Sequence, residues 1–154
     1  MKKMKLQKIV SRLQELHPKE IDLSLERIKN LCKKLGNPQD KIKVISVVGT
    51  NGKYSTIQAM FAILKEANIK CNIYTSPHIK NINERFIFDN QQLNDEELVS
   101  LFQEIENVNN NEPITFFEIL TAAYFLKSSK YLNNINLVET GLFHRFDATN
   151  ILKS

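Results

Sequence analysis

The sequence has little of what marks a secreted, metal-stapled or membrane-spanning chain. It contains no tryptophan and only 2 cysteines, Cys32 and Cys71, which lie far apart without the spacing of metal ligands. We therefore expect both to be small buried side chains and not disulfide partners. No apolar run approaches the length of a membrane span, and the basic start of the chain lacks the apolar core of a signal peptide. These absences favour a cytoplasmic protein.

Charge of one sign is not concentrated anywhere in the chain. The formal net charge is +4, from 21 basic and 17 acidic residues that are interleaved along the sequence. Nucleic-acid binding is typical of proteins with a concentrated basic face and interleaved aromatic residues. We therefore expect no nucleic-acid partner and no membrane partner, while the modest positive excess suits a small polyanion such as a nucleotide.

The 154 residues, 42% of them hydrophobic, fit one domain with a sizeable core, and their apolar patterns predict an α/β fold. We expect strands at 43–48, 71–74 and 135–139, and a short hairpin arm at 85–92. The expected helices span 2–16, 20–35, 53–67, 95–106 and 115–131, with residues 107–111 as loop. Asn94 with Glu97 three residues later forms a capping-box pattern. The alternation predicts a three-layer fold with a parallel sheet, whose ligands gather at the carboxyl ends of the strands.

Glycine is scarce, yet two of the 4 glycines lie in the run Gly49-Thr50-Asn51-Gly52-Lys53-Tyr54-Ser55. The run follows an apolar strand and precedes a helix. Such a turn directs backbone N–H groups and the positive helix end at an anion, and Lys53 adds a point charge. The Walker pattern would place a glycine at Val47 and a hydroxyl directly after the lysine. We therefore predict a variant phosphate loop (P-loop).

Two further polar clusters follow strand ends, Thr75-Ser76-Pro77-His78 after Tyr74 and Glu139 after Val138. In a parallel sheet these ends share one edge. Mg²⁺ takes hard oxygen ligands such as carboxylates and hydroxyls, so Glu139 and Ser76 are candidate magnesium ligands. Each has a plainer interpretation, because Ser-Pro is a common turn pair and Glu139 could be an exposed strand end. Nearby, we expect His78 to be solvated and Glu84 and Arg85 to form a surface pair.

Ordered blocks along the chain point to one family. They are Gly49–Lys53, Tyr74–His78, Asn83–Arg85, Thr115–Glu118, Glu139–Leu142 and Asp147–Asn150. In this order and spacing they resemble the N-terminal part of folylpolyglutamate synthase/dihydrofolate synthase, within the Mur ligase superfamily. The resemblance runs from about Leu16 to the last residue.

The resemblance implies an ADP-forming carbon–nitrogen ligase with Mg²⁺ as cofactor and ATP as co-substrate. Such an enzyme joins L-glutamate to dihydropteroate or tetrahydrofolate through an acyl phosphate, and it would be a monomer at full length. The implied site residues fall into three groups. Lys53 and Glu139 would be catalytic, with Gly49, Thr50, Asn51, Gly52, Lys53 and Ser55 binding ATP. Ser76 and Glu139 would hold the metal, and Thr115, Phe117 and Asp147 would bind the folate.

By the same resemblance, residues 1–40 would be N-terminal helices that pack on the domain. Residues 41–154 would be the N-terminal portion of a Mur-ligase-like ATP-binding domain, without the C-terminal glutamate-ligase domain. We therefore expect a truncated chain that is inactive alone. The family has glycine where this chain has Tyr54, and a glycine pair where it has Phe143 and His144.

Two alternatives stay open. One is another Mur-type amide ligase, such as a peptidoglycan-precursor ligase, against which the Tyr74–His78 and Thr115–Glu118 blocks argue. The other is a non-catalytic nucleotide-binding or structural remnant, which the truncation and the three departures from the family favour.

Overall fold

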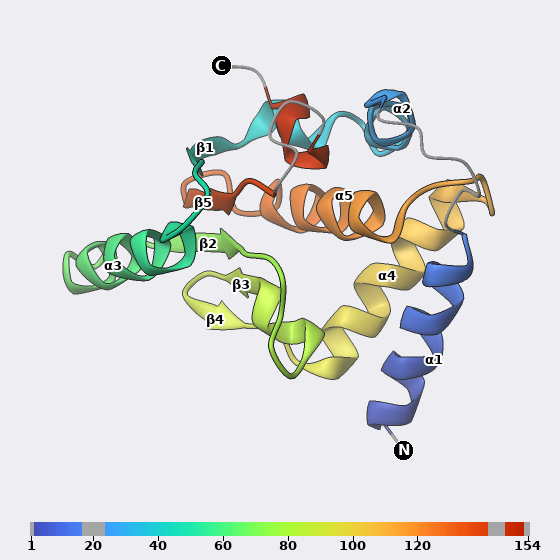
Figure 1. Ribbon diagram of the computed structural model, residues 1–154, viewed down its shortest axis with the longest axis horizontal. Coiled ribbons are helices and arrows are strands. Elements are labelled where there is room, and N and C mark those ends of the chain that lie inside the picture. The colour runs from blue at the N-terminus through green and yellow to red at the C-terminus, as the bar shows by residue number, and fades with distance from the viewer. Residues whose placement is uncertain (1, 17–23, 142–146, 153–154) are drawn as a thin grey trace.

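The computed structural model describes residues 2–16, 24–141 and 147–152 of the chain. One five-stranded sheet has the order β1-β5-β2-β3-β4 (Figure 1). The strands β1 (Lys43–Val47), β5 (Ile135–Glu139) and β2 (Cys71–Tyr74) are parallel, whereas β3 (Phe86–Phe88) and β4 (Gln91–Gln92) continue the sheet antiparallel. The predicted strands are confirmed. The predicted parallel pairing is confirmed for β1, β5 and β2, and the hairpin arm joins the same sheet beside β2, which makes the whole sheet mixed.

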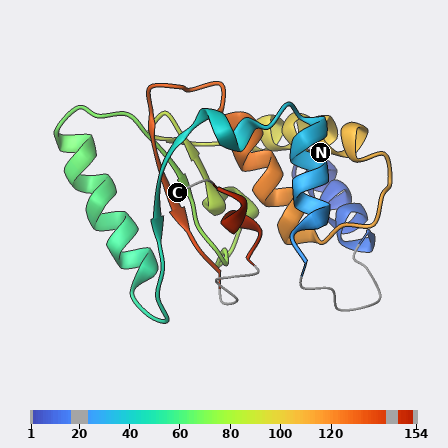
Figure 2. The same ribbon diagram turned by 90° about the horizontal axis from the view of Figure 1, so that it is seen from above.

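The sheet has helices on both faces, so the three layers are confirmed. Helix α3 (Lys53–Glu66) covers one face, and α5 (Phe116–Ser128) with the remaining helices covers the other (Figure 2). Alternate residues of a strand point to opposite faces. Ile73 and Leu137 pack with Ile57 of α3, while their neighbours Tyr74 and Val138 belong to the larger core under α5.

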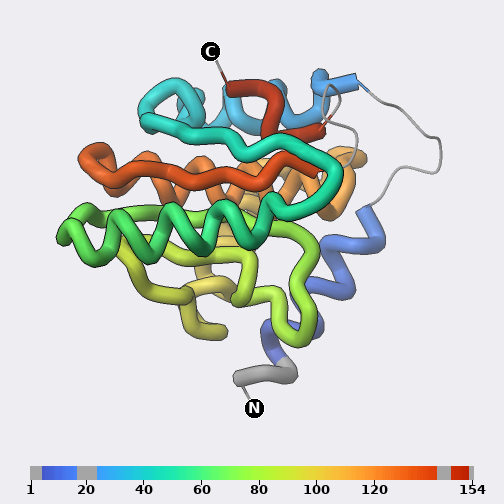
Figure 3. Tube along the Cα trace, turned by 60° about the vertical axis from the view of Figure 1, so that its left-hand side comes forward, coloured from blue at the N-terminus to red at the C-terminus, as the bar shows by residue number. Residues whose placement is uncertain are grey.

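The connection through α3 does not place β1 and β2 side by side. Strand β5, from the far end of the chain, lies between them and pairs with both (Figure 3). The carboxyl ends of β1, β5 and β2 therefore sit next to one another. Strand β1 is the edge of the sheet, because no strand pairs with its other side among the described residues. Ile45 in β1 and Val48 directly after it are 41% and 50% exposed.

Helix α4 (Asp95–Asn109) begins at the predicted cap, where Asn94 and Glu97 form both bonds of a capping box. The helix runs through Asn109, so the loop expected from residue 107 is wrong at its start. Val108 packs on the core and continues the helix, which ends where Asn110 turns left-handed, with φ 51°. The composition of an asparagine run predicted a loop, but tertiary packing carries the helix further.

The two N-terminal helices pack against α4 and α5. Helix α1 (Lys2–Glu15) buries Leu6, Ile9 and Leu13, and its Arg12 pairs with Glu106 of α4. Helix α2 (Glu26–Lys34) forms within the helix expected at 20–35. Ser24 and Leu25 precede it and are not helical, so the expected start is too early, and residues 17–23 lie outside the described residues.

Three short 3₁₀ helices, η1 (Pro38–Lys41), η2 (Ile82–Arg85) and η4 (Ala148–Ile151), complete the described fold. Both cysteines are buried and free, as expected, and burial raises the pKa of the Cys32 thiol to about 12. None of the described helices is long and apolar enough to cross a membrane.

Candidate active site

The glycine loop joins β1 to α3 through two backbone conformations that favour glycine. Gly49 has φ 152° and Gly52 has φ 76°, a region that side chains disfavour. Gly52 is the N-cap of α3, no side chain caps this helix, and Thr50 and Asn51 are exposed. The first N–H groups of a helix have no partner within it. At α3 these donors and the positive helix end are therefore left for an anion.

Lys53 lies at the first position of α3 and folds back over the loop. Its ammonium donates a 2.9 Å hydrogen bond to the Gly49 carbonyl and lies 3.9 Å from Glu139 Oε1. The Lys53 side chain is 11% exposed and that of Glu139 is 6% exposed. The Lys53 ammonium is thus held beside the glycine loop, where it could contact a phosphate group. In the absence of a phosphate, Glu139 partly balances its charge.

Glu139 brings a second strand end to this point. Its Oε2 accepts a 3.0 Å hydrogen bond from the backbone N–H of Ser76. The register explains the meeting, because Val47 pairs with Glu139 and Tyr74 pairs with Val138. The ends of β1, β5 and β2 thus converge as predicted, and the structure brings the loop, Lys53, Glu139 and Ser76 together.

The oxygen atoms at this point fit a hard divalent cation. One carboxylate and one hydroxyl, from Glu139 and Ser76, suit Mg²⁺, which fills its remaining positions with phosphate oxygens and water. No group of three histidine, cysteine or acidic side chains that could hold a metal occurs within residues 2–16, 24–141 and 147–152.

The hydroxyls at the start of α3 differ in their bonding. Thr56 Oγ1 donates to the Gly52 carbonyl at 3.0 Å, which fixes the turn of the loop. Ser55, the hydroxyl expected near the phosphates, is exposed, as is Tyr54, at 57%. The Tyr54 side chain is therefore in solvent and not packed in the core. The other two departures, Phe143 and His144, lie outside the described residues.

The three predicted folate-binding residues lie near the start of α5. Thr115 caps the helix, its Oγ1 accepting from Glu118 N at 3.2 Å. Phe117 is half-buried and stacks on Tyr74, with ring centroids 6.1 Å apart. The Tyr74 phenol is fully buried, which raises its pKa, and it hydrogen-bonds Thr121 at 3.1 Å. Tyr74, the last residue of β2, thus supports the Phe117 ring from the edge of the sheet at which β1, β5 and β2 end.

Asp147 closes this second cluster through Gly141. Its Oδ2 accepts from Gly141 N at 3.0 Å, and its Oδ1 accepts from Thr149 N at 2.9 Å. A Cβ on Gly141 would lie 2.2 Å from Asp147 Oδ2 and 4.0 Å from Phe117 Cζ. Asp147 and Phe117 therefore both lie close to Gly141, and the lack of a side chain at Gly141 leaves space for the Asp147 carboxylate. Gly141 lies in the Glu139–Leu142 block but was not predicted to have a role, because its close approach to Asp147 arises only in the folded chain.

The loop after Ser76 differs from expectation. Glu84 is not a surface partner of Arg85, because its carboxylate accepts the N–H groups of Ile79, Lys80 and Asn81 at 2.7, 3.0 and 2.8 Å. These bonds lower the pKa of Glu84. Arg85 instead donates to His78 Nδ1 at 2.8 Å. Half-buried His78 is thus not simply solvated, and burial followed by Arg85 lowers its pKa.

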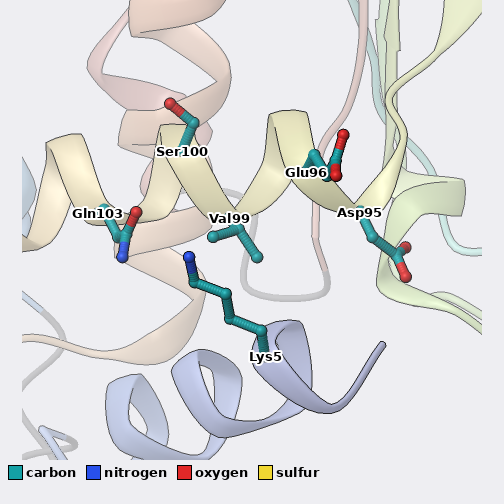
Figure 4. Close-up of a pocket in the computed structure, with 6 residues that line it drawn as sticks. All are labelled: Lys5, Asp95, Glu96, Val99, Ser100 and Gln103. Carbon is teal, nitrogen blue, oxygen red and sulfur yellow. The ribbon is translucent and has the colours of Figure 1, made fainter. Parts of the chain in front are cut away.

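A cavity of about 210 Å³ between α1 and α4 contains none of the predicted site residues. In Figure 4 its Lys5 side chain extends from α1 toward Val99 and Gln103 of α4, and the carboxylates Asp95 and Glu96 lie at the start of that helix. Because both signs of charge line this cavity, it selects no simple ion.

Known proteins resemble the chain in sequence and in structure. It is 39% identical over 147 residues to the dihydrofolate synthase/folylpolyglutamate synthase of Haemophilus influenzae, covering 94% of this chain and 33% of that protein. The structure of Escherichia coli FolC in complex with DHPP and ADP matches with a TM-score of 0.88 and 34% identity, over 97% of this chain and 36% of that chain.

A bifunctional folylpolyglutamate synthase/dihydrofolate synthase from Yersinia pestis, complexed with AMPPNP and a Mn ion, matches with a TM-score of 0.88 and 33% identity, over 97% of this chain and 36% of that one. No family model matches the chain. The chain spans about a third of the length of these relatives. Over that third, the chain matches the dihydrofolate synthase/folylpolyglutamate synthases in both sequence and fold.

Proposed function

We propose that this chain supplies the ATP-binding and folate-binding parts of an ATP-dependent ligase that joins L-glutamate to dihydropteroate or tetrahydrofolate. One observation carries the proposal, namely that Lys53, Glu139 and Ser76 converge beside the uncapped start of α3. Residues 41–154 then form part of the ATP-binding domain, and residues 1–40 contribute helices that pack on it. Solved relatives in complex with ADP, or with AMPPNP and a Mn ion, support a nucleotide with a divalent cation.

In this proposal the glycine loop and Lys53 hold the ATP phosphates. Backbone N–H groups of Gly49 to Gly52 would surround them, and Lys53 would leave the Gly49 carbonyl for the β- and γ-phosphates. Ser76 and Glu139 would hold Mg²⁺, which neutralises charge developing on the transferred phosphoryl group when bound. The chain's own residues position the phosphoryl group for attack, which is the main catalytic task in such a transfer.

The acceptor would lie between Thr115, Phe117 and Asp147. Phe117 offers a ring face for stacking a pterin, and the Asp147 carboxylate retains lone pairs that accept from a pterin amine. A substrate carboxylate oxygen then attacks the γ-phosphorus, and ADP leaves. The glutamate amine attacks the acyl carbon, loses a proton and displaces phosphate. The chain matches only about a third of the length of its relatives. We propose that the second step depends on the parts of those relatives that the match does not cover.

Calorimetric titration with ATP and Mg²⁺ tests the nucleotide proposal. The wild-type chain is expected to bind, and Lys53→Ala to lose binding by at least tenfold, since it removes a charged phosphate contact worth about 1.5–3 kcal/mol. Lys65→Ala is the matched control, because Lys65 is an exposed lysine in the last turn of the same helix. Absence of heat and of thermal shift with the wild-type chain at millimolar nucleotide would overturn the proposal.

We further propose that the intact protein is a cytoplasmic monomer without a nucleic-acid partner, in keeping with its interleaved charges. The 154-residue chain is expected to bind nucleotide without forming dihydrofolate or polyglutamate. Measurable product from the isolated chain in a coupled ADP-release assay would contradict the proposal that the second step needs further parts of the ligase.

A further inference from the structure

Asn51 is the only asparagine of the sequence that directly precedes a glycine. Asparagine is one of the chemically labile residues of proteins. The backbone nitrogen of the next residue can attack its side-chain amide, and glycine hinders this attack least because it has no Cβ. The pair Asn51-Gly52 lies in the glycine loop directly before α3, so a chemical change at Asn51 alters the candidate phosphate site itself.

The structure leaves this pair open to reaction. Both residues are exposed, and a Cβ built on Gly52 would meet nothing within 4 Å. The Asn51 side chain has no hydrogen bond or ion pair with a described residue. The Gly52 carbonyl accepts from Thr56, but the Gly52 N–H has no partner within residues 2–16, 24–141 and 147–152. Neither the attacking nitrogen nor the side chain that it attacks is thus held in place by the described part of the chain.

The charge around the pair favours the reaction. An amide nitrogen attacks after it loses its proton, so negative charge develops first on the Gly52 nitrogen and then on the side-chain oxygen of Asn51. The positive end of α3 begins at Gly52, and the Lys53 ammonium is fixed 2.9 Å from the Gly49 carbonyl in the same loop. Positive charge that is already in place where negative charge develops lowers the barrier to a reaction.

The other end of α3 provides the opposite case. Asn68 follows the C-cap Ala67 and is exposed, as Asn51 is. The next residue, Ile69, is β-branched, and its N–H donates to the Leu64 carbonyl at 2.8 Å. Attack at Asn68 would have to break this bond, beside a bulky side chain and at the negative end of the helix. The exposed asparagines at the ends of α3 therefore differ in the freedom of the N–H group that would attack.

We propose that Asn51 is a site of spontaneous deamidation, which converts the glycine loop into a form that carries a carboxylate at the start of α3 and binds nucleotide less tightly. The Gly52 nitrogen gives its proton to water and forms a bond to Asn51 Cγ. The bond from Cγ to the side-chain nitrogen breaks, and ammonia leaves. Water then opens the cyclic imide at either of its carbonyl carbons, which yields aspartate or isoaspartate.

The new carboxylate acts differently on the fold and on nucleotide binding. A negative charge near a helix N-terminus interacts favourably with the helix, so aspartate at Asn51 leaves α3 stable. The same charge attracts the N–H groups and the Lys53 ammonium that a phosphate needs, and it repels the phosphate. This loss of binding rests on the proposed nucleotide site, whereas the conversion of Asn51 does not. A bound nucleotide is expected to slow the conversion, because its phosphates would engage the Gly52 N–H.

The conversion is tested by incubating the full chain in mildly alkaline buffer without nucleotide, followed by tryptic peptide mapping with mass spectrometry. Trypsin separates the two asparagines into peptides 44–53 and 66–70. The first peptide is expected to gain the mass of an amide-to-acid change and to split into aspartate and isoaspartate forms, while the second stays unchanged. Asn51→Gln is expected to suppress the change, because its longer side chain would have to close a larger ring.

The consequence is tested by calorimetric titration of the fresh chain and of Asn51→Asp with ATP and Mg²⁺. Asn51→Asp is expected to bind about tenfold or more weakly, the effect of one charged contact, without a fall in melting temperature. Two results would overturn the inference, namely conversion of Asn51 no faster than that of Asn68, or equal ATP affinity of the two proteins. If the fresh chain binds no ATP, the ligase proposal fails, while the conversion rates still decide whether Asn51 is a deamidation site.

Discussion

Glu139, the last residue of β5, accepts a 3.0 Å hydrogen bond from the backbone amide of Ser76, the second residue after β2. The other oxygen of the same carboxylate faces the Lys53 ammonium at 3.9 Å. One buried carboxylate therefore links the loops after β2 and β1. A cation bound between Ser76 and Glu139 would take over part of the charge balance that Lys53 now provides.

Glu139→Gln is expected to remove the metal dependence of nucleotide binding. The amide keeps the size of the side chain but cannot supply the negative charge that holds Mg²⁺. ATP affinity, measured calorimetrically with Mg²⁺ and with EDTA, should differ in the wild-type chain by about tenfold or more and become nearly equal in the variant. Glu66→Gln, at the exposed end of α3, is the control. A variant that keeps the full Mg²⁺ effect would contradict the metal assignment.

Glu84→Gln is expected to destabilise the chain at neutral pH and not in acid. Three backbone N–H groups, those of Ile79, Asn81 and Lys80, lower the pKa of Glu84 below its ordinary value of 4.5. A carboxyl group with a lower pKa in the folded state stabilises the fold above its unfolded pKa and loses this effect as pH falls through the folded value.

The measurement for Glu84 is thermal unfolding of both proteins from about pH 7 down to about pH 2. The melting temperatures should differ most at neutral pH and converge below the ordinary glutamate pKa. Glu66→Gln serves again as an exposed glutamate without these bonds. A difference that stays constant over the whole range would show that the charge of Glu84 is not responsible.

Gly141→Ala is expected to cost about 2–3 kcal/mol of unfolding free energy, because its Cβ would lie 2.2 Å from Asp147 Oδ2, and the carboxylate could move aside only by giving up its bonds to the N–H groups of Gly141 and Thr149. Gly36→Ala is the comparator. Its Cβ would meet only the Lys41 ammonium, at 3.8 Å, so that about 1 kcal/mol of left-handed backbone cost remains. Urea unfolding of both variants gives the two values. Equal losses would argue against a tight Gly141–Asp147 contact.

Local sequence signals were enough to predict most elements and their meeting point. The strands, the cap at Asn94, and the polar residues after each strand are all features of neighbouring residues. Because parallel strands end at one edge, their order did not have to be known for Lys53, Glu139 and Ser76 to be expected together. The roles of these residues stay predictions.

Features that depend on distant pairs were not predictable in this way. The insertion of β5 between β1 and β2 follows from the packing of the whole sheet, which local patterns do not encode. The buried pair Asn72 and Asn136, bonded at 3.0 Å inside two strands, runs against strand composition. Tyr124 donates to the same Asn136 oxygen at 3.0 Å, so a polar network that sequence composition disfavours is satisfied by the fold.

The Arg27–Glu118 pair is a further contact of this distant kind, and it supports the start of α5. Glu118 Oε2 accepts from Arg27 Nε at 3.1 Å and from Thr115 N at 2.8 Å, and its side chain is 6% exposed. Arg27→Met is expected to cost about 3 kcal/mol, because it leaves a buried carboxylate without its cation.

Chemical denaturation of a double-mutant cycle measures this pair. Arg27→Met with Glu118→Gln should lose less stability than the sum of the single changes, since the uncompensated charge is gone while the amide oxygen still accepts from Thr115. Lys29→Met is the control on the same helix. Its ion pair with Glu26 is 3.8 Å long and solvent-exposed, so its loss should be nearly neutral. If Arg27→Met costs no more than Lys29→Met, then Arg27 does not hold the start of α5, and Thr115 and Phe117 depend on the capping box alone.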